Sequence, residues 1–129
     1  MTITVPTSAG ELIDKITILE IKAERITDPA RLGHVHNELG ALKSTRAAAW
    51  AQPAPALATL TEALKRVNQA LWDIEDEIRA CERAQDFGAR FIELARAVYR
   101  TNDRRAALKN EINQLLSSAL VEVKSYAEY

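Results

Sequence analysis

FIELARAVYRTNDRRAALKNEINQLLSSA, residues 91–119, is the stretch that decides the fold. Apolar residues recur in it at alternating steps of three and four, the pattern of a long helix packed against other helices. This packing seam consists of Phe91, Leu94, Val98, Thr101, Arg105, Leu108, Ile112, Leu115 and Ala119. Because Thr101 and Arg105 are polar, the seam is apolar, then polar for about two turns, then apolar again. The polar part of the seam is the best candidate for a functional site.

The preceding segment predicts the partner helix. Residues 56–84 carry an unbroken heptad rhythm, and a helix of that length would span roughly 45 Å. The rhythm slips between Cys81 and Phe91, where Asp86 and Gly88 favour a turn. We therefore expect helices at about 56–84 and 87–118 to form a long antiparallel hairpin. The alternative is one continuous bent helix of about 60 residues.

Two further helices are predicted in the N-terminal half. Ser8 and Glu11 form a capping-box pattern, which predicts a helix at about 9–26. That helix is apolar on several sides, so we expect it to be buried on more than one side. Asp28 followed by Pro29 predicts a second helix at about 29–50. Residues 2–5 alternate polar and apolar side chains and are a candidate short N-terminal strand, for which residues 120–124 would be the partner.

The composition suits one helical domain over residues 1–129. Apolar residues make up 47% of the chain but aromatic residues only 5%, a balance that favours helices over sheets. The net charge of −1 argues against a nucleic-acid-binding protein. Because there is neither a signal-peptide pattern nor an apolar run of the ~20 residues that a membrane span needs, we expect a cytoplasmic protein. Cys81 occupies an apolar seam position, which predicts a buried, inert thiol.

Arg105 on a packed face needs a partner for its charge. Carboxylates on other helices that could supply it are Asp14, Glu20, Asp76 and Glu77. Arg105 could also form one wall of an anion site, because a guanidinium binds carboxylate or phosphate through paired hydrogen bonds. Lys109 lies one turn further on, and Asn102 and Asn113 would add neutral donors. Two purely structural interpretations stay open: Arg105 reaches water at the end of the bundle, or it forms a buried salt bridge that fixes helix register.

Asp14 and Lys15 are unexpected on a helix as apolar as residues 9–26. Packed against the helix at 87–118, they would complete a mixed-charge cleft with Arg105 and Lys109, in which Asp14 is the candidate acid or base. Glu11 and Lys15 also have a plain structural explanation, because residues four apart on a helix form a stabilising pair.

The tail after residue 119 contains Ser125 and Tyr126 among other polar residues. Such a tail often frays. Val121 and Val123 argue instead that part of it docks, and it would then fold back over the polar part of the seam.

No metal and no cofactor are expected. The four carboxylates within residues 73–77 fan out around a helix axis, so a solvated face is the better explanation for them. His34 and His36 are two residues apart, whereas a helical zinc pair needs a spacing of four. The sequence contains no Gly-rich phosphate loop, no G-x-S-x-G motif and no pair of cysteines.

Several motifs resemble those of a family of short bacterial proteins of unknown function. They are G-E-L-I-D-K at residues 10–15, L-W-D-I-E-D-E-I-R at 71–79, F-I-E-L-A-R at 91–96, N-D-R-R at 102–105 and K-S-Y at 124–126. The family has no activity to transfer, but the resemblance implies an association with genes for cell-surface polysaccharide synthesis. It also implies that Asn102, Arg105 and Lys109 belong to a family pattern, which favours a functional role over an accidental end of the bundle.

The helix at 9–26 also resembles, more weakly, the first helix of the all-helical chorismate mutases. The shared features are Ile13-Asp14 near its start and Glu24-Arg25 at its end. The resemblance implies, as an alternative, that Arg and Lys hold a dianionic substrate between helices. One helix alone matches, and the remaining arginines of those enzymes have no counterpart that we can place.

Together these patterns predict an all-α bundle built on a long antiparallel αα-hairpin, with the helix at 9–26 packed on the helix at 87–118. We expect a homodimer, because a second copy can cover the apolar face of such a hairpin. The first functional hypothesis is a protein, whether or not an enzyme, that binds a small anion or a sugar phosphate. Its site would consist of Asp14, Lys15, Asn102, Arg105, Lys109 and Asn113. The second is a non-catalytic adaptor, and a role in cell-surface polysaccharide metabolism is compatible with either.

Overall fold

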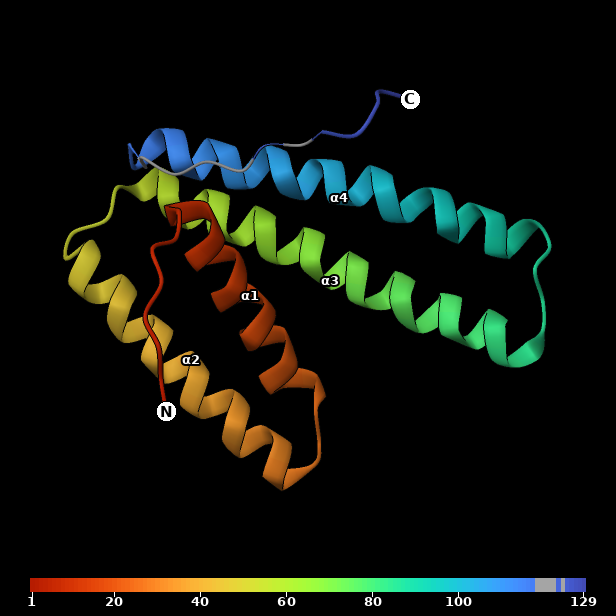
Figure 1. The fold of residues 1–129 in the computed structure, drawn as a ribbon, viewed down its shortest axis with the longest axis horizontal. Helices are drawn as coiled ribbons and strands as arrows, with labels where there is room; N and C mark the ends of the chain where they lie inside the picture. Colours follow the sequence, from red (N-terminus) through yellow and green to blue (C-terminus); the bar gives the residue numbers. More distant parts are fainter. Residues whose placement is uncertain (118–122, 124) are drawn as a thin grey trace.

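The computed structural model describes residues 1–117, 123 and 125–129, and its regular structure is helical (Figure 1). The helices are α1 (Ala9–Arg25), α2 (Pro29–Ala49), α3 (Pro55–Ala84) and α4 (Ala89–Leu115). α1 and α2 form one antiparallel hairpin, and α3 and α4 form a second, longer one. The fold is therefore an all-α helical bundle, as the sequence predicts.

The long hairpin confirms the central expectation and excludes a single bent helix. α3 has 30 residues, which corresponds to roughly 45 Å. It ends at Ala84 and is capped by Gln85, whose φ of 55° is left-handed, and the amide of Asp86 donates to the carbonyl of Cys81 at 2.9 Å. This hydrogen bond is the signature of a Schellman C-cap, which reverses the chain. The Asp86 side chain then accepts a hydrogen bond from the amide of Gly88, the N-cap residue of α4, at 3.1 Å.

α1 lies at the centre of the bundle, because α2, α3 and α4 each pack against it. One apolar cluster joins Ile13 of α1 to Leu64 of α3 and Ile112 of α4. A second cluster joins Ile16 of α1 to Val35 of α2. Ile13 and Ile16 are both 0% exposed, which confirms the prediction that this helix is covered on more than one side.

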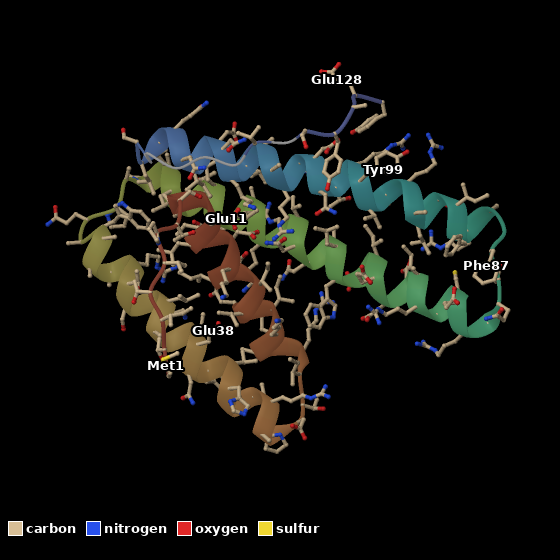
Figure 2. All side chains as sticks on the ribbon, viewed as in Figure 1. Met1, Glu11, Glu38, Phe87, Tyr99 and Glu128 are labelled. Atoms are coloured by element: carbon tan, nitrogen blue, oxygen red, sulfur yellow. The ribbon has the colours of Figure 1, made fainter. Side chains whose placement is uncertain are left out.

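The half of the long hairpin next to the α3–α4 turn extends beyond α1 and α2 (Figure 1). We call it the outer half; it holds the α3–α4 turn with Phe87 and the start of α4 with Ile92. Phe87 at the turn and Ile92 near the start of α4 are 48% and 56% exposed (Figure 2). α1 therefore covers the other half of the hairpin, which carries the polar part of the seam.

One local prediction was wrong, that of an N-terminal strand, and the predicted helix ends were approximate. Residues 2–5 form no strand; Ile3 and Val5 are 72% and 66% exposed, and most of the proposed partner at 120–124 lies outside the described residues. A single extended segment has no neighbouring strand with which to form backbone hydrogen bonds, so its backbone groups bond to water instead. The predicted helix ends differ from the observed ones by up to three residues. α4 begins later because Gly88 rather than Asp86 caps it, and it stops before Ser117, whose φ of 51° is left-handed.

Candidate functional site

The polar part of the α4 seam faces α1, and Arg105 lies opposite Asp14. Arg105 Nε donates to Asp14 Oδ1 at 2.9 Å, and Nη2 donates to Oδ2 at 2.5 Å. In this bidentate geometry a guanidinium binds a carboxylate most strongly. The Asp14 side chain is 3% exposed and that of Arg105 is 29% exposed. The carboxylate is therefore buried, whereas the guanidinium reaches the edge of the bundle, and the structure selects Asp14 from the four candidate partners.

Asn68 of α3 adds hydrogen bonds to the buried carboxylate. Its Nδ2 donates to Asp14 Oδ1 and to Thr17 Oγ1, each at 2.9 Å, and the Thr17 hydroxyl donates to the carbonyl of Asp14 at 2.8 Å. Thr17 and Asn68 are both buried, so one polar network ties α1, α3 and α4 together. Asn68 was not among the predicted site residues. Its position four residues after the buried Leu64 places it on the apolar face of α3, which is the signal that identifies it.

Lys109 makes the second ion pair between α4 and α1. Its Nζ lies 2.6 Å from Oε1 of Glu11, and the two side chains are 6% and 44% exposed. The expected pair of Glu11 with Lys15 is replaced by this contact. Lys15 instead lies 3.1 Å from Glu38 of α2, so it is not brought together with Arg105 and Lys109. Figure 2 shows the two carboxylate partners, Glu11 near the start of α1 and Glu38 on α2.

The start of α1 lies directly against α4. The Gly10 amide donates to Asn113 Oδ1 at 2.7 Å. A Cβ at residue 10 would lie 2.4 Å from the carbonyl oxygen of Lys109, so only glycine permits this approach without a shift of the helices. Asn113 is 2% exposed, and its Nδ2 has no hydrogen-bond partner among the described residues. Asn113 thus anchors α1 through its side-chain oxygen.

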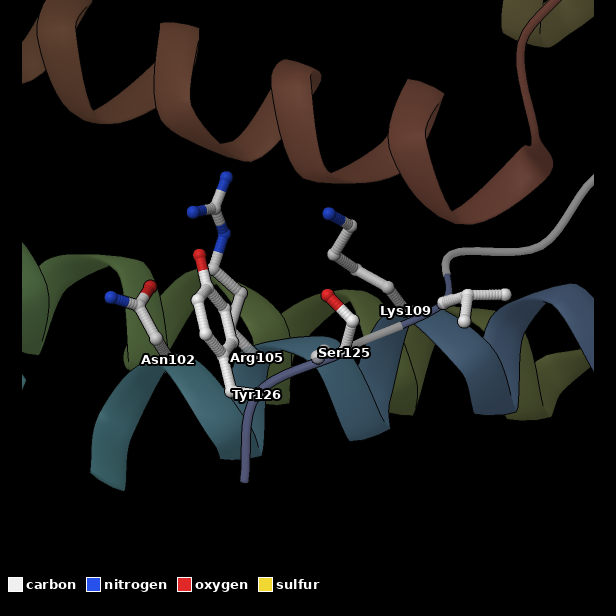
Figure 3. A pocket seen from close by; sticks show the side chains of 7 residues that line it. Asn102, Arg105, Lys109, Ser125 and Tyr126 are labelled. Carbon is white, nitrogen blue, oxygen red and sulfur yellow. The ribbon is translucent and has the colours of Figure 1, made fainter. Parts of the chain in front are cut away.

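A pocket of about 380 Å³ opens beside these ion pairs, and we call it the cationic pocket. Asn102, Arg105 and Lys109 of α4 line it together with Ser125 and Tyr126 of the C-terminal segment. Figure 3 shows Arg105 and Lys109 pointing from α4 toward α1, with Ser125 and Tyr126 on the neighbouring C-terminal segment. The volume lies within the range of small-molecule sites, roughly 300–1,000 Å³. The described part of the tail therefore lies over the polar part of the seam. This agrees with the interpretation in which the tail folds back rather than frays.

The charges beside the cationic pocket are balanced by α1. Arg105 and Lys109 face the carboxylates of Asp14 and Glu11. Asp14 cannot give up its partner without leaving a buried charge uncompensated. The Glu11 carboxylate is half-exposed and can turn into solvent, but the 6%-exposed Lys109 ammonium then needs another anion in its place. One counterion is thus fixed and the other exchangeable.

The other charged groups singled out in the sequence lie outside this pocket. Three of the four carboxylates within residues 73–77 make surface ion pairs: Asp73 with Arg25, Glu75 with Arg79 and Glu77 with Arg90. Within the described residues, no group of His, Cys, Asp and Glu is placed to hold a metal ion. Cys81, expected to be buried, is partly exposed. None of the helices in the described part of the chain has the length and apolar character of a membrane span.

Fold and site together define a class of protein: an all-α bundle of two helical hairpins, joined by ion pairs beside a polar pocket. Residues 3–128 match the family of unknown function DUF6165, so the chain belongs to that family. This match confirms the resemblance of the sequence motifs to a family of unknown function. No curated protein and no solved structure matches the chain.

Proposed function

We propose that this protein binds a small anionic molecule, such as a phosphate ester, in the cationic pocket. The observation that carries the proposal is the position of two cations one helical turn apart, Arg105 and Lys109, in the wall of one pocket. Asn102, Ser125 and Tyr126 add an amide and two hydroxyls to the same wall. Charged and neutral donors of these kinds together bind phosphate oxygens.

Lys109 is the residue that changes partner in this proposal. An entering anion takes the place of Glu11 at Lys109 Nζ, and the 44%-exposed Glu11 side chain turns to water. The Lys109 side chain is only 6% exposed, so the new contact forms where the effective dielectric is lower than in water. A charge-assisted hydrogen bond is stronger in such surroundings.

Asp14 has a positioning role in this proposal rather than that of an acid or base. It does not line the cationic pocket, and its carboxylate accepts hydrogen bonds from Arg105 and Asn68. The pair holds the guanidinium at the pocket wall in one orientation, which preorganises the site. The proposal is therefore one of binding and assigns no reaction.

Thermal denaturation with a panel of anions tests the proposal. The panel contains inorganic phosphate, hexose 1-phosphates, nucleotides and dicarboxylates at increasing concentrations. A ligand at a hundredfold excess over its Kd stabilises the folded state by about 2.7 kcal/mol. We expect at least one phosphate-bearing compound to raise the Tm in a saturable manner.

Variants of pocket residues separate binding from folding. Asn102→Ala removes a lining amide that lies outside the Asp14 network, and Lys109→Gln removes one cation; each should weaken the ligand-induced shift in Tm. Arg66→Ala is the control, because Arg66 is 78% exposed on α3 and should leave the shift unchanged. The proposal is wrong if no anion stabilises the protein, or if Asn102→Ala and Lys109→Gln respond to the anion as the unaltered chain does.

A second candidate function is that of a non-catalytic adaptor. It is favoured by the outer half of the hairpin, where Phe87 and Ile92 are exposed and neither α1 nor α2 lies over them. An adaptor would bind its partner there, and small anions would leave its Tm unchanged. A role in cell-surface polysaccharide metabolism fits either candidate.

No observation in the structure favours the chorismate-mutase-like alternative. Arg25, one residue of the resemblance, pairs with Asp73 outside the cationic pocket. Conversion of chorismate to prephenate, followed by ultraviolet absorbance, tests this alternative directly.

A further inference from the structure

A second pocket adjoins the cationic pocket along α4. It has a volume of about 410 Å³, and Asn102 and Tyr126 line both pockets. The chain contains three tyrosines, and all of them, Tyr99, Tyr126 and Tyr129, line this second pocket. We therefore call it the tyrosine pocket. Its wall also contains Asp103.

The tyrosine rings are presented to solvent rather than packed in the core. Tyr99, Tyr126 and Tyr129 are 42%, 84% and 78% exposed. Figure 2 shows Tyr99 on the side of α4 where the C-terminal segment ends, next to Glu128. Tyrosine combines an apolar ring with a polar tip and is enriched where proteins recognise ligands and partners. Three such rings around one hollow form an amphipathic binding surface.

We infer that the two pockets form one extended site for a sugar phosphate, with the phosphate at Arg105 and Lys109 and the sugar ring against the tyrosines. This inference rests on the proposed function and adds the class of ligand to it. Lys109 and Tyr99 are ten residues apart on α4, which corresponds to roughly 15 Å. That distance accommodates a phosphate followed by one or two sugar rings.

The geometry of the tyrosines favours a sugar over a nucleobase. The rings of Tyr99 and Tyr129 have centroids 5.2 Å apart and are inclined by 59°, so they pack on each other and leave no gap in which a flat base could be sandwiched. A pyranose is puckered, and it presents C–H groups on its faces and hydroxyls around its rim. Inclined rings can contact such faces.

Polar groups beside the rings can take the sugar hydroxyls. Asp103 supplies carboxylate oxygens that accept hydrogen bonds, and Asn102 supplies both a donor and an acceptor. A hydrogen bond from the Tyr129 hydroxyl to the Asp103 carboxylate raises the pKa of Tyr129. Apolar faces and hydroxyl partners are thus both present in the tyrosine pocket.

Isothermal titration calorimetry with separate probes tests the inference on the full chain. The probes are inorganic phosphate, the 1-phosphates of glucose, galactose and mannose, and adenosine 5′-monophosphate. We expect at least one hexose 1-phosphate to bind about threefold to tenfold more tightly than inorganic phosphate, the gain of one ring contact. Tyr99→Ala and Tyr129→Ala should remove that gain and leave the affinity for inorganic phosphate unchanged.

The outcomes distinguish this inference from the proposed function. If inorganic phosphate binds and no hexose gains affinity over it, the inference is overturned and the proposed function stands. The same conclusion follows if the gain survives both tyrosine substitutions. A larger gain for adenosine 5′-monophosphate than for every hexose 1-phosphate overturns the choice of a sugar. If no phosphate-bearing probe binds, the proposed function fails, and the inference fails with it.

Discussion

Removal of either member of the Asp14–Arg105 pair should destabilise the protein by unequal amounts. Arg105→Ala leaves the Asp14 carboxylate buried at 3% exposure, with Asn68 still donating to it. A buried charge that loses its partner costs roughly 3–5 kcal/mol, and we expect a value of about 4 kcal/mol for this variant. Asp14→Ala leaves a guanidinium that is 29% exposed and can turn toward the cationic pocket. Its cost should therefore be lower, about 2 kcal/mol.

The double variant Asp14→Ala/Arg105→Ala should be destabilised by much less than the sum of the two single costs. With both charges gone, no buried charge is left uncompensated, and we expect a cost of about 3–4 kcal/mol and a coupling energy of about 2–3 kcal/mol. Urea unfolding followed by far-ultraviolet circular dichroism measures all four proteins. The control is the exposed i, i+4 pair of Glu75 and Arg79, at 3.3 Å, whose coupling should be about 0.3–0.5 kcal/mol.

Two results would refute this account of the pair. Costs that add to within about 0.5 kcal/mol would mean that the two side chains do not interact. An Asp14→Ala variant that is as unstable as Arg105→Ala would mean that Arg105 cannot reach solvent through the cationic pocket.

Further predictions concern the helix contacts, the C-terminal segment and the assembly. Gly10→Ala should destabilise the protein by about 1–3 kcal/mol, because the added Cβ would lie 2.4 Å from a backbone oxygen. Gly33→Ala should stabilise it by about 1 kcal/mol, because the added Cβ would have no atom within 4 Å. Urea unfolding of both variants checks these values. The hydrogen bond from the Tyr129 hydroxyl to Asp103 should persist below pH 10.0 and be lost as the pH rises through the raised pKa of Tyr129; ring resonances of Tyr129 in an NMR titration should follow the loss. If the outer half of the hairpin joins two copies, light scattering should give twice the chain mass of 14.3 kDa. Ile92→Lys should then give the mass of one chain, because Ile92 is exposed on that half. The mass of one chain for the unaltered protein would contradict the dimer.

The helices and the position of the polar interruption could be predicted from the sequence because both depend on local spacing. Caps at Ser8 and Asp28 and the unbroken rhythm from Leu57 to Cys81 fix where helices begin and which face is apolar. The interruption at Arg105 is visible for the same reason, because one residue on an apolar face carries a charge. These are properties of single elements.

The partners of the polar residues could not be chosen from the sequence, because they depend on how the helices cross. Periodicity assigns Asp14 to a face of α1, but it does not say that this face meets Arg105. Glu11 is four residues from Lys15, yet the close approach at Gly10 brings Glu11 to Lys109 instead. A contact between helices thus overrides a pairing that local spacing favours.

The central claim, that an anion exchanges with Glu11 at Lys109, is tested most directly by the affinity of Glu11→Gln for phosphate-bearing ligands. The substitution removes the competing carboxylate and keeps the size of the side chain. The account predicts that calorimetry will show binding at least about twofold tighter than for the unaltered chain, because Lys109 is 6% exposed and its pair with Glu11 is worth at least as much as an exposed ion pair. Glu38→Gln, which changes only the partner of Lys15, should leave the affinity unchanged. Equal or weaker binding by Glu11→Gln would contradict the claim.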